Sequence, residues 1–421
     1  MYQNVVKLLG ATSLSQLLPI LILPILTNQL SLEAFGFLGS YISLILIVSI
    51  FVTLRLEPSI VLCGKDSYFQ AENIRTITIY TTVFVALILS IVQVFYETPV
   101  QVLICFVVTV FSFSNTKVIE QFLTEKERYS EVSKNKVTLS LVTSLLHLCA
   151  AFAIGEGDYL LIYSYTLSFL ICNIYFLYKS NLRVFPFLKV KKLELLLEHK
   201  KFSKFELPSD FIFQLSQNLP IVIIMTVFGA EIAGFYSLAE KIILLPVSMI
   251  GSTLGVVYYR EMSKEKGNLA QSKQTKLILN GLFGLVVAGA FIYYFCIDYL
   301  IKFAFNDDYV GLSVYTDYLI LYGIVLFVSS PLSGALWKAG KQNINLMLSV
   351  ITFIFRCCLF YIVSLNFTFH SALLFLIVSS IFPRVLLFCF CMKHLSLNNL
   401  EIVIYNILLF SILFVSYQVF I

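Results

Sequence analysis

Long apolar runs separated by short polar segments dominate this sequence. An α-helix rises ~1.5 Å per residue, so a run of about 20 residues spans the ~30 Å hydrocarbon core of a bilayer. None of the runs alternates polar and apolar residues as a membrane β-strand would. The pattern therefore predicts thirteen membrane-spanning helices, at residues 4–28, 35–54, 76–95, 100–119, 137–154, 159–178, 208–229, 234–258, 276–296, 315–337, 344–365, 371–392 and 401–420.

Composition agrees with this pattern. Hydrophobic residues make up 59% of the chain and charged residues 13%, against roughly 45–50% and about 25% in soluble globular proteins. Soluble classes are thereby excluded, and we expect an all-α integral membrane protein.

One short sequence occurs twice. Residues 14–20 read LSQLLPI and residues 215–221 read LSQNLPI, which agree at six of seven positions. Six spans precede the second copy, and because six is even, both copies cross the membrane in the same direction. Parallel repeats of this kind are typical of transporters. We predict two six-helix lobes related by a pseudo-two-fold axis along the membrane normal, with one extra helix at the C-terminal end.

The longest connection marks where the lobes divide. It spans residues 179–207 and carries eight Lys and Arg residues. Within it, residues 189–205 mix Leu with Lys, a pattern that fits an amphipathic helix on the inner leaflet or a solvated linker. The predicted domains are an N-lobe at 1–178, a basic cytoplasmic linker at 179–207, a C-lobe at 208–392 and the extra helix at 393–421.

Basic residues predict the orientation. Alternate loops, beginning with 55–75, hold 24 of the 29 Lys and Arg residues, whereas the opposite loops hold only Lys302. Cytoplasmic loops are the basic ones. The N-terminus and the basic loops are therefore expected in the cytoplasm.

Motifs for enzyme chemistry are missing from the sequence. It contains no Walker loop and no GxGxxG, HExxH or GxSxG motif, and its nine cysteines and four histidines share no metal-ligand spacing. The longest outer loop, 297–314, is too short for a catalytic domain. His147 lies near mid-membrane, where packing or a hydrogen bond to a neighbouring helix is favoured over proton relay. We expect no enzyme activity, no cofactor and no metal.

Polar side chains within the spans point to a binding site, because they are costly in lipid. Four of them share one face of span 7, at positions i, i+4, i+7 and i+8: Asp210, Gln214, Gln217 and Asn218. Span 1, the matching helix of the first half, carries Gln16 beside Thr12 and Ser15. We predict that both stripes line one central cavity. Hydrogen bonding between helices without a ligand is the alternative.

Three cations lie well away from the ends of the predicted spans. Arg356 and Arg384 are near the midplane, and Lys241 is seven residues into span 8, next to Glu240. A buried guanidinium pairs naturally with a carboxylate or a phosphate. We predict that all three bind substrate, and that neutral replacement of either arginine spares membrane insertion but abolishes transport. Structural pairing with Glu240 or Asp210 is the alternative.

Two motif regions resemble a known family. Gly36 and Phe37 open the second span, and Arg55-Leu56-Glu57-Pro58-Ser59-Ile60 closes it. A second region runs from Gly234 through Pro246 to Tyr259. Both are similar to stretches of the O-antigen type polysaccharide flippases, in the multidrug/oligosaccharidyl-lipid/polysaccharide (MOP) exporter superfamily. Arg55, Glu57 and Pro246 are the motif residues carried over.

The chain departs from that family in two respects. Tyr259-Arg260 stands where the family commonly has a proline, and thirteen spans are predicted where the family has twelve or fourteen. The two-lobed core that the resemblance implies is unaffected.

The resemblance implies a flippase. Its substrate would be an O-antigen or capsule repeat unit on polyprenyl diphosphate, moved by alternating access to the outer leaflet of a bacterial inner membrane. Membrane lipids, a polysaccharide polymerase and a chain-length regulator would be partners, and nucleic acid would not. A drug or small-lipid exporter of the same superfamily is one alternative and would favour buried carboxylates. A membrane polymerase or glycosyltransferase is another and would need larger outer loops.

Overall fold

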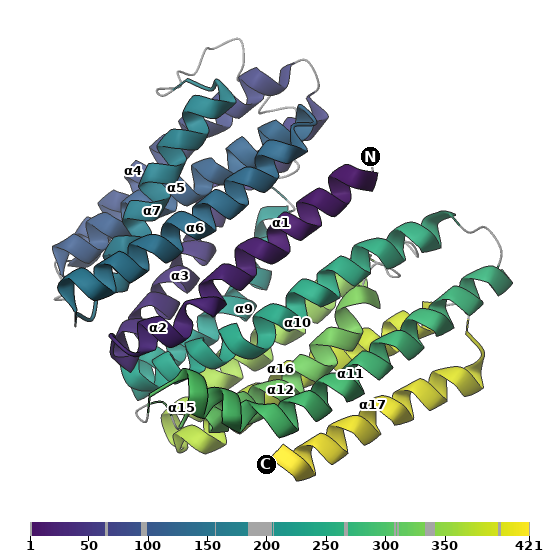
Figure 1. Cartoon of the computed structure of the whole chain (residues 1–421). Coiled ribbons are helices and arrows are strands. Elements are labelled where there is room, and N and C mark those ends of the chain that lie inside the picture. Colours follow the sequence, from purple (N-terminus) through teal and green to yellow (C-terminus); the bar gives the residue numbers. More distant parts are fainter. Residues whose placement is uncertain are drawn as a thin grey trace. The chain divides into compact units, whose positions relative to one another are not determined.

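The computed structural model describes residues 2–63, 66–93, 99–155, 157–183, 204, 206–264, 268–306, 309, 311–332, 342–394 and 397–420. These residues form helices joined by turns and contain no strand (Figure 1). Thirteen helical segments of the described chain are long and apolar enough to cross a membrane, one for each predicted span. The predicted all-α membrane class is confirmed. The chain divides into two compact units, residues 1–222 and 223–421.

Unit 1 holds the helices of the first half and the beginning of the next helix. Its elements are α1 (Tyr2–Leu21), α2 (Leu23–Thr27), α3 (Leu32–Thr53), the 3₁₀-helix η1 (Glu57–Leu62), α4 (Ser67–Gln93), α5 (Val100–Glu125), α6 (Tyr129–Ile154), α7 (Leu160–Ser180) and the first part of α9 (Leu207–Phe228).

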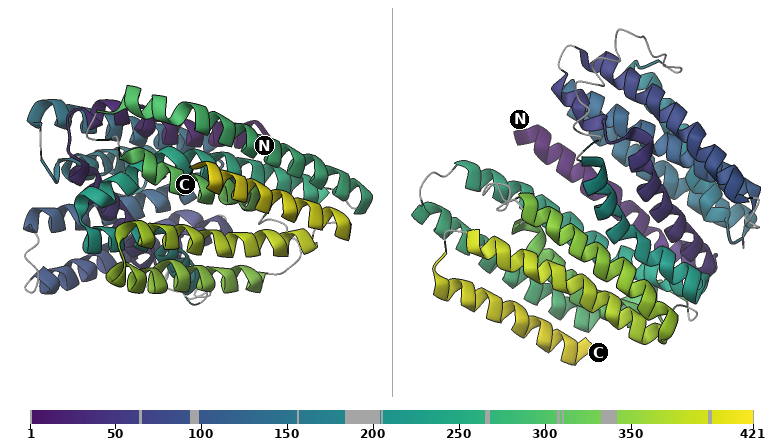
Figure 2. Two further views of the ribbon diagram at one scale, coloured as in Figure 1. Left: turned by 90° about the horizontal axis from the view of Figure 1, so that it is seen from below. Right: turned by 180° about the vertical axis from the view of Figure 1, so that it is seen from behind.

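Unit 2 holds the remainder of α9 and the helices that follow it. These are α10 (Ala230–Lys264), α11 (Asn268–Ala304), α12 (Leu312–Leu332), α14 (Gln342–Phe353), the π-helix η6 (Ile354–Leu359), α15 (Phe360–Asn366), α16 (Phe369–His394) and α17 (Asn399–Phe420). The C-terminal helix α17 lies along the outside of this unit, against α11, α12 and α16 (Figure 2).

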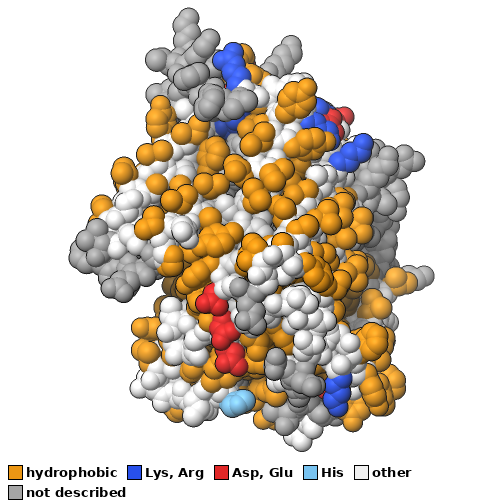
Figure 3. Space-filling view, turned by 60° about the vertical axis from the view of Figure 1, so that its left-hand side comes forward, with side chains coloured by type: hydrophobic (Ala, Val, Ile, Leu, Met, Phe, Trp, Pro, Cys, Tyr) orange, Lys and Arg blue, Asp and Glu red, His pale blue; other side chains and the backbone are white. Residues whose placement is uncertain are grey.

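Apolar side chains spread over the outside of the helices. Phe303 is 92% exposed and Tyr178 is 84% exposed, and hydrophobic side chains cover much of the face drawn in Figure 3, with few charged ones between them. Exposure on this scale would be unfavourable in water but is expected where lipid is the solvent.

Polar side chains hold the interior of unit 1 together. The hydroxyl of Tyr41 on α3 lies 2.8 Å from Thr109 Oγ1 on α5 and 3.0 Å from Thr166 Oγ1 on α7. On α6, His147 Nδ1 lies 2.7 Å from Ser164 Oγ of α7, which confirms the predicted hydrogen bond to a neighbouring helix. Such bonds supply the association that hydrophobic burial cannot provide in lipid.

Several helices extend beyond the predicted spans. Helix α4 begins at Ser67 rather than at residue 76, α5 ends at Glu125 rather than at 119, and α6 begins at Tyr129 rather than at 137. The predicted limits were therefore wrong at these ends. Apolar runs mark only the lipid-facing part of a helix, whereas these ends carry polar and charged side chains, such as the Glu72–Arg75 ion pair at the start of α4.

The two copies of the repeat lie in α1 and α9, and each places a proline inside its helix, at Pro19 and Pro220. The predicted symmetry and the lobe boundaries stay predictions. The stretch 189–203 of the predicted amphipathic segment lies outside the described residues.

Candidate functional site

A cluster of charged and aromatic side chains lies inside unit 2. Helix α10 contributes Tyr236 and Glu240, α12 contributes Tyr322, η6 contributes Arg356, and α16 contributes Arg384. We call these five residues the arginine–tyrosine cluster. Its depth follows from Tyr322, which is the middle residue of the 21-residue helix α12. Arg356 is only 2% exposed, and Tyr322 and Tyr236 are also buried.

Tyr322 contacts both arginines that the sequence analysis named. The guanidinium carbon of Arg356 lies 5.3 Å from the centroid of the Tyr322 ring, within the range of a cation–π interaction. Arg384 also interacts with the Tyr322 side chain. The fold thus brings together two arginines that are 28 positions apart in the sequence.

Glu240 supplies negative charge to the cluster. Its carboxylate interacts with the Tyr236 side chain one helical turn earlier on α10 and, electrostatically, with Arg356. Lys241, the next residue on α10, is half-buried and interacts with Glu240. Of the two carboxylates named as structural alternatives, Glu240 is therefore the one near Arg356. Counting the two arginines and Lys241 against Glu240, positive charge exceeds negative charge here.

The backbone is unusual at Arg356. This residue lies in η6, a six-residue π-helix between the α-helical segments α14 and α15. A π-turn replaces the usual i→i−4 hydrogen bonds with i→i−5 bonds, and such turns occur frequently at functional sites. The sequence IFRCCL contains neither proline nor glycine, so it gives no sign of a π-helix.

Pro246, a residue carried over from the family motif, lies inside α10, six residues after Glu240. It lines an apolar cavity of about 240 Å³ together with Gly289 of α11 and Phe327 of α12. Nearby, a Cβ added at Gly323 would lie 3.4 Å from Ile243 Cγ2, so α10 and α12 approach closely. Pro246 is thus part of the packing around the cluster rather than a member of it.

Unit 1 has a second charged group, at the turn after α3. Leu54 and Arg55 both adopt left-handed backbone conformations, with φ of 50° and 54°. L-residues pay about 1–2 kcal/mol for this conformation, so surrounding contacts must hold the turn. The Arg55 side chain makes those contacts.

Arg55 pairs with two carboxylates. Its Nη1 lies 3.2 Å from Glu57 Oε1, and its Nε forms an ion pair with Asp210 at the start of α9. The side chains of Arg55 and Asp210 are 33% and 34% exposed, whereas that of Glu57 is 4% exposed. Burial alone would lower the pKa of Arg55, but Glu57 and Asp210 outweigh burial and raise the pKa, so the guanidinium stays charged.

A lysine lies next to this group. Lys117 on α5 extends its ammonium to 3.4 Å from Ser49 Oγ and to 4.5 Å from the centroid of the Phe113 ring. It interacts electrostatically with Glu57 and Asp210. Nothing in the sequence singled out Lys117, which lies at the end of the predicted span 100–119.

The polar stripe of α9 is satisfied mostly within its own helix. Asn218 Nδ2 donates to Gln214 Oε1 at 2.7 Å, and Gln217 Nε2 donates to Ser216 Oγ at 3.4 Å. On α1, Gln16 Oε1 is buried without a hydrogen-bond partner. Asp210 is brought to Arg55, and the shared lining of a central cavity by the α1 and α9 stripes stays a prediction.

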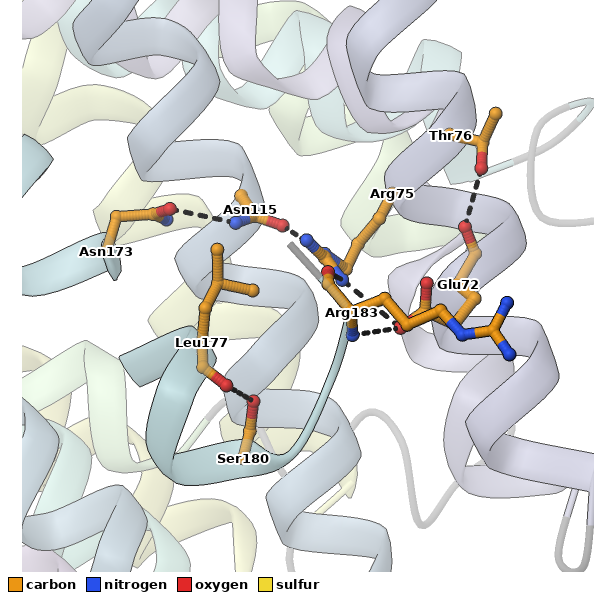
Figure 4. A network of polar contacts seen from close by, with 8 residues as sticks. All are labelled: Glu72, Arg75, Thr76, Asn115, Asn173, Leu177, Ser180 and Arg183. Atoms are coloured by element: carbon orange, nitrogen blue, oxygen red, sulfur yellow. Dashed lines mark hydrogen bonds and ion pairs between the residues drawn. The ribbon is translucent and has the colours of Figure 1, made fainter. Parts of the chain in front are cut away.

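A third buried charge pair was missed. Glu72 and Arg75 lie on α4, in a stretch that the sequence analysis assigned to a loop, and they contact Asn115 and the main chain of Arg183 (Figure 4). The spacing of three residues between an acidic and a basic side chain, suited to a helical ion pair, was the signal in the sequence.

Comparisons with known proteins place the fold. A family model described as polysaccharide biosynthesis protein matches residues 25–314, and no curated protein sequence matches significantly. An inward-facing multidrug resistance MATE family transporter of the MOP superfamily superposes with a TM-score of 0.68 at 13% identity, covering 92% of this chain and 94% of that one. The lipid II flippase MurJ, in an inward closed conformation, also gives 0.68, at 12% identity, covering 99% and 93%. A MOP superfamily transporter from Pyrococcus furiosus gives 0.59 at 12% identity, covering 93% and 95%.

Proposed function

Because the chain belongs to the polysaccharide biosynthesis protein family, we propose that it is a flippase for oligosaccharides linked to polyprenyl diphosphate. The cargo would be an O-antigen or capsule repeat unit, moved from the cytoplasmic to the outer leaflet of a bacterial inner membrane. The observation that carries this proposal is the excess of positive charge in the arginine–tyrosine cluster, at mid-depth in a helical membrane protein of this family.

The cluster suits a diphosphate for a physical reason. A diphosphate crossing the bilayer loses its hydration, and guanidinium groups replace water with charge-assisted hydrogen bonds. Arg384 is half-buried, which suits first contact with an arriving anion. Arg356 lies deeper and would add charge without needing to touch the ligand.

The remainder of the substrate needs different partners. Sugar hydroxyls bind amides, and we propose that Gln16, Gln214, Gln217 and Asn218 serve them. The isoprenoid tail can stay in lipid throughout, so only the head group needs a polar path, which we propose opens to each side in turn by alternating access. A polysaccharide polymerase and a chain-length regulator would use the delivered unit.

Orientation gives a first prediction. A reporter fused after Lys192 should read cytoplasmic, and one fused near Asp307 should read outside, because the basic loops are expected on the cytoplasmic side. Alkaline phosphatase and green fluorescent protein fusions, compared at matched expression, make the measurement. An outside signal at Lys192 would contradict the proposed direction.

Reconstitution tests the function itself. In proteoliposomes containing the purified chain, a labelled polyprenyl-diphosphate oligosaccharide should change leaflet much faster than in protein-free vesicles, and a neutral glycolipid of equal tail length should not.

Export of cationic drugs is the competing function, and Glu240 is the residue that favours it, since a carboxylate inside the protein suits a cationic drug. Transport of cationic dyes without movement of the diphosphate lipid would replace the proposal with that function.

A further inference from the structure

Glu72 and Arg75 of α4 hold the main chain of one residue beyond α7. Arg75 Nη1 donates to the carbonyl oxygen of Arg183 at 2.6 Å, and the backbone N–H of Arg183 donates to Glu72 Oε1 at 2.9 Å. The same Nη1 lies 3.2 Å from Glu72 Oε1. One ion pair thus satisfies both main-chain hydrogen-bonding groups of residue 183 (Figure 4).

The pair is deeply buried and joined to two more helices. Glu72 is 6% exposed and Arg75 is 2% exposed. Arg75 Nε donates to Asn115 Oδ1 of α5 at 2.8 Å, and Asn115 Nδ2 donates to Asn173 Oδ1 of α7 at 3.0 Å. Because a buried charged group is costly without its partners, α4, α5 and α7 are held together at this point.

The way α7 ends places residue 183 next to Glu72 and Arg75. Helix α7 is capped by Asn181 in the left-handed conformation, with φ of 58°, an ending that asparagine tolerates well. Leu182 then packs into the apolar core of unit 1 with Phe176 and Leu177. The side chain of Arg183 is exposed and makes none of the contacts drawn in Figure 4.

We propose that Glu72 and Arg75 form a main-chain clamp, which fixes the chain leaving α7 to helix α4 at residue 183. The clamp binds the backbone of residue 183 and not its side chain. It should therefore hold this position whichever amino acid occupies it. During transport α4, α5 and α7 then stay one body up to residue 183. This inference holds whatever cargo is moved.

Hydrogen–deuterium exchange tests the clamp in the full-length protein in lipid nanodiscs. The amide of residue 183 should be protected in the wild type and equally in Arg183→Ala, the matched control. Glu72→Ala removes the charged acceptor, so exchange of this amide should rise roughly ten- to a hundredfold. Amides in the middle of α12, in the other unit, should not change.

Two further variants keep the proposal falsifiable. Glu72→Gln retains an acceptor oxygen and should raise exchange only severalfold, so it serves if Glu72→Ala accumulates poorly. The exchanged pair Glu72→Arg with Arg75→Glu keeps both charges but presents a donor to the N–H, and protection should stay lost. Unchanged exchange in both Glu72 variants, recovery in the exchanged pair, or equal loss in Arg183→Ala would each overturn the clamp.

Discussion

Arg356→Gln should lower surface polysaccharide by more than about tenfold and should also lower the amount of inserted protein. The substitution leaves Glu240 in the interior of unit 2 without the guanidinium that faces it. Glu240 is half-buried, and leaving such a carboxylate uncompensated costs roughly 1–3 kcal/mol or more, a sizeable share of a total stability of about 5–15 kcal/mol. This differs from the expectation based on sequence alone, that neutral replacement spares insertion, because the fold brings Glu240 near Arg356.

The double variant Arg356→Gln with Glu240→Gln separates stability from transport. With both charges gone, no uncompensated carboxylate is left, and the amount of inserted protein should return toward the wild-type level. Export per inserted molecule should stay low, since the guanidinium is still missing. Both quantities come from one experiment, polysaccharide staining at the cell surface and immunoblotting of the membrane fraction. Wild-type export by the double variant would assign the pair a structural role only.

The same two quantities, export and abundance, should be measured for variants of Arg384. It interacts with Tyr322 and is half-buried, so Arg384→Gln should keep normal abundance while export falls. Arg384→Lys should rescue only in part, because it keeps the charge but not the bidentate geometry. Tyr322→Phe is the matched control, since it removes the hydroxyl but keeps the ring beneath Arg356. Strong loss in Tyr322→Phe would mean that positioning of Arg384 matters as much as its charge.

Apolar run length located all thirteen spans, because a lipid-crossing helix must be apolar over a fixed length. The same signal misplaced the start of α4, where Glu72 and Arg75 continue the helix as a buried ion pair. A hydropathy pattern shows which part of a helix faces lipid. It does not show where polar side chains that interact inside the protein extend the helix beyond that part.

The sequence also identified most of the charged residues in the two candidate sites. It did not show which side chains these residues contact. Arg356 and Arg384 were singled out by depth, yet their common neighbour Tyr322 carries no charge and gave no signal. The π-helix at Arg356 has no sequence marker either. Arg55 was named as a motif residue and Asp210 as part of a polar helical face. Their ion pair could not be predicted, because it depends on the packing of α9 within unit 1.

Arg55→Gln should lower the amount of folded protein several-fold, and Asp210→Asn should change it little. Asp210 is one-third exposed, and ion pairs at exposed positions contribute only about 0.2–1 kcal/mol. Glu57 is 4% exposed, so loss of Arg55 leaves a buried carboxylate unpaired, which costs roughly 1–3 kcal/mol or more. The left-handed turn at Leu54 and Arg55 loses its support in the same step.

The double variant Arg55→Gln with Glu57→Gln is the control that identifies the cause. It removes the stranded carboxylate and should recover most of the lost protein, measured as the monodisperse fraction after heating in detergent. Arg55→Lys should lie between the wild type and Arg55→Gln, because an ammonium cannot reach two carboxylates as a guanidinium fork does. If Asp210→Asn proves as damaging as Arg55→Gln, the turn is held by α9 rather than by Glu57, and the ion pair to Asp210 becomes the main contact that keeps this end of α9 in unit 1.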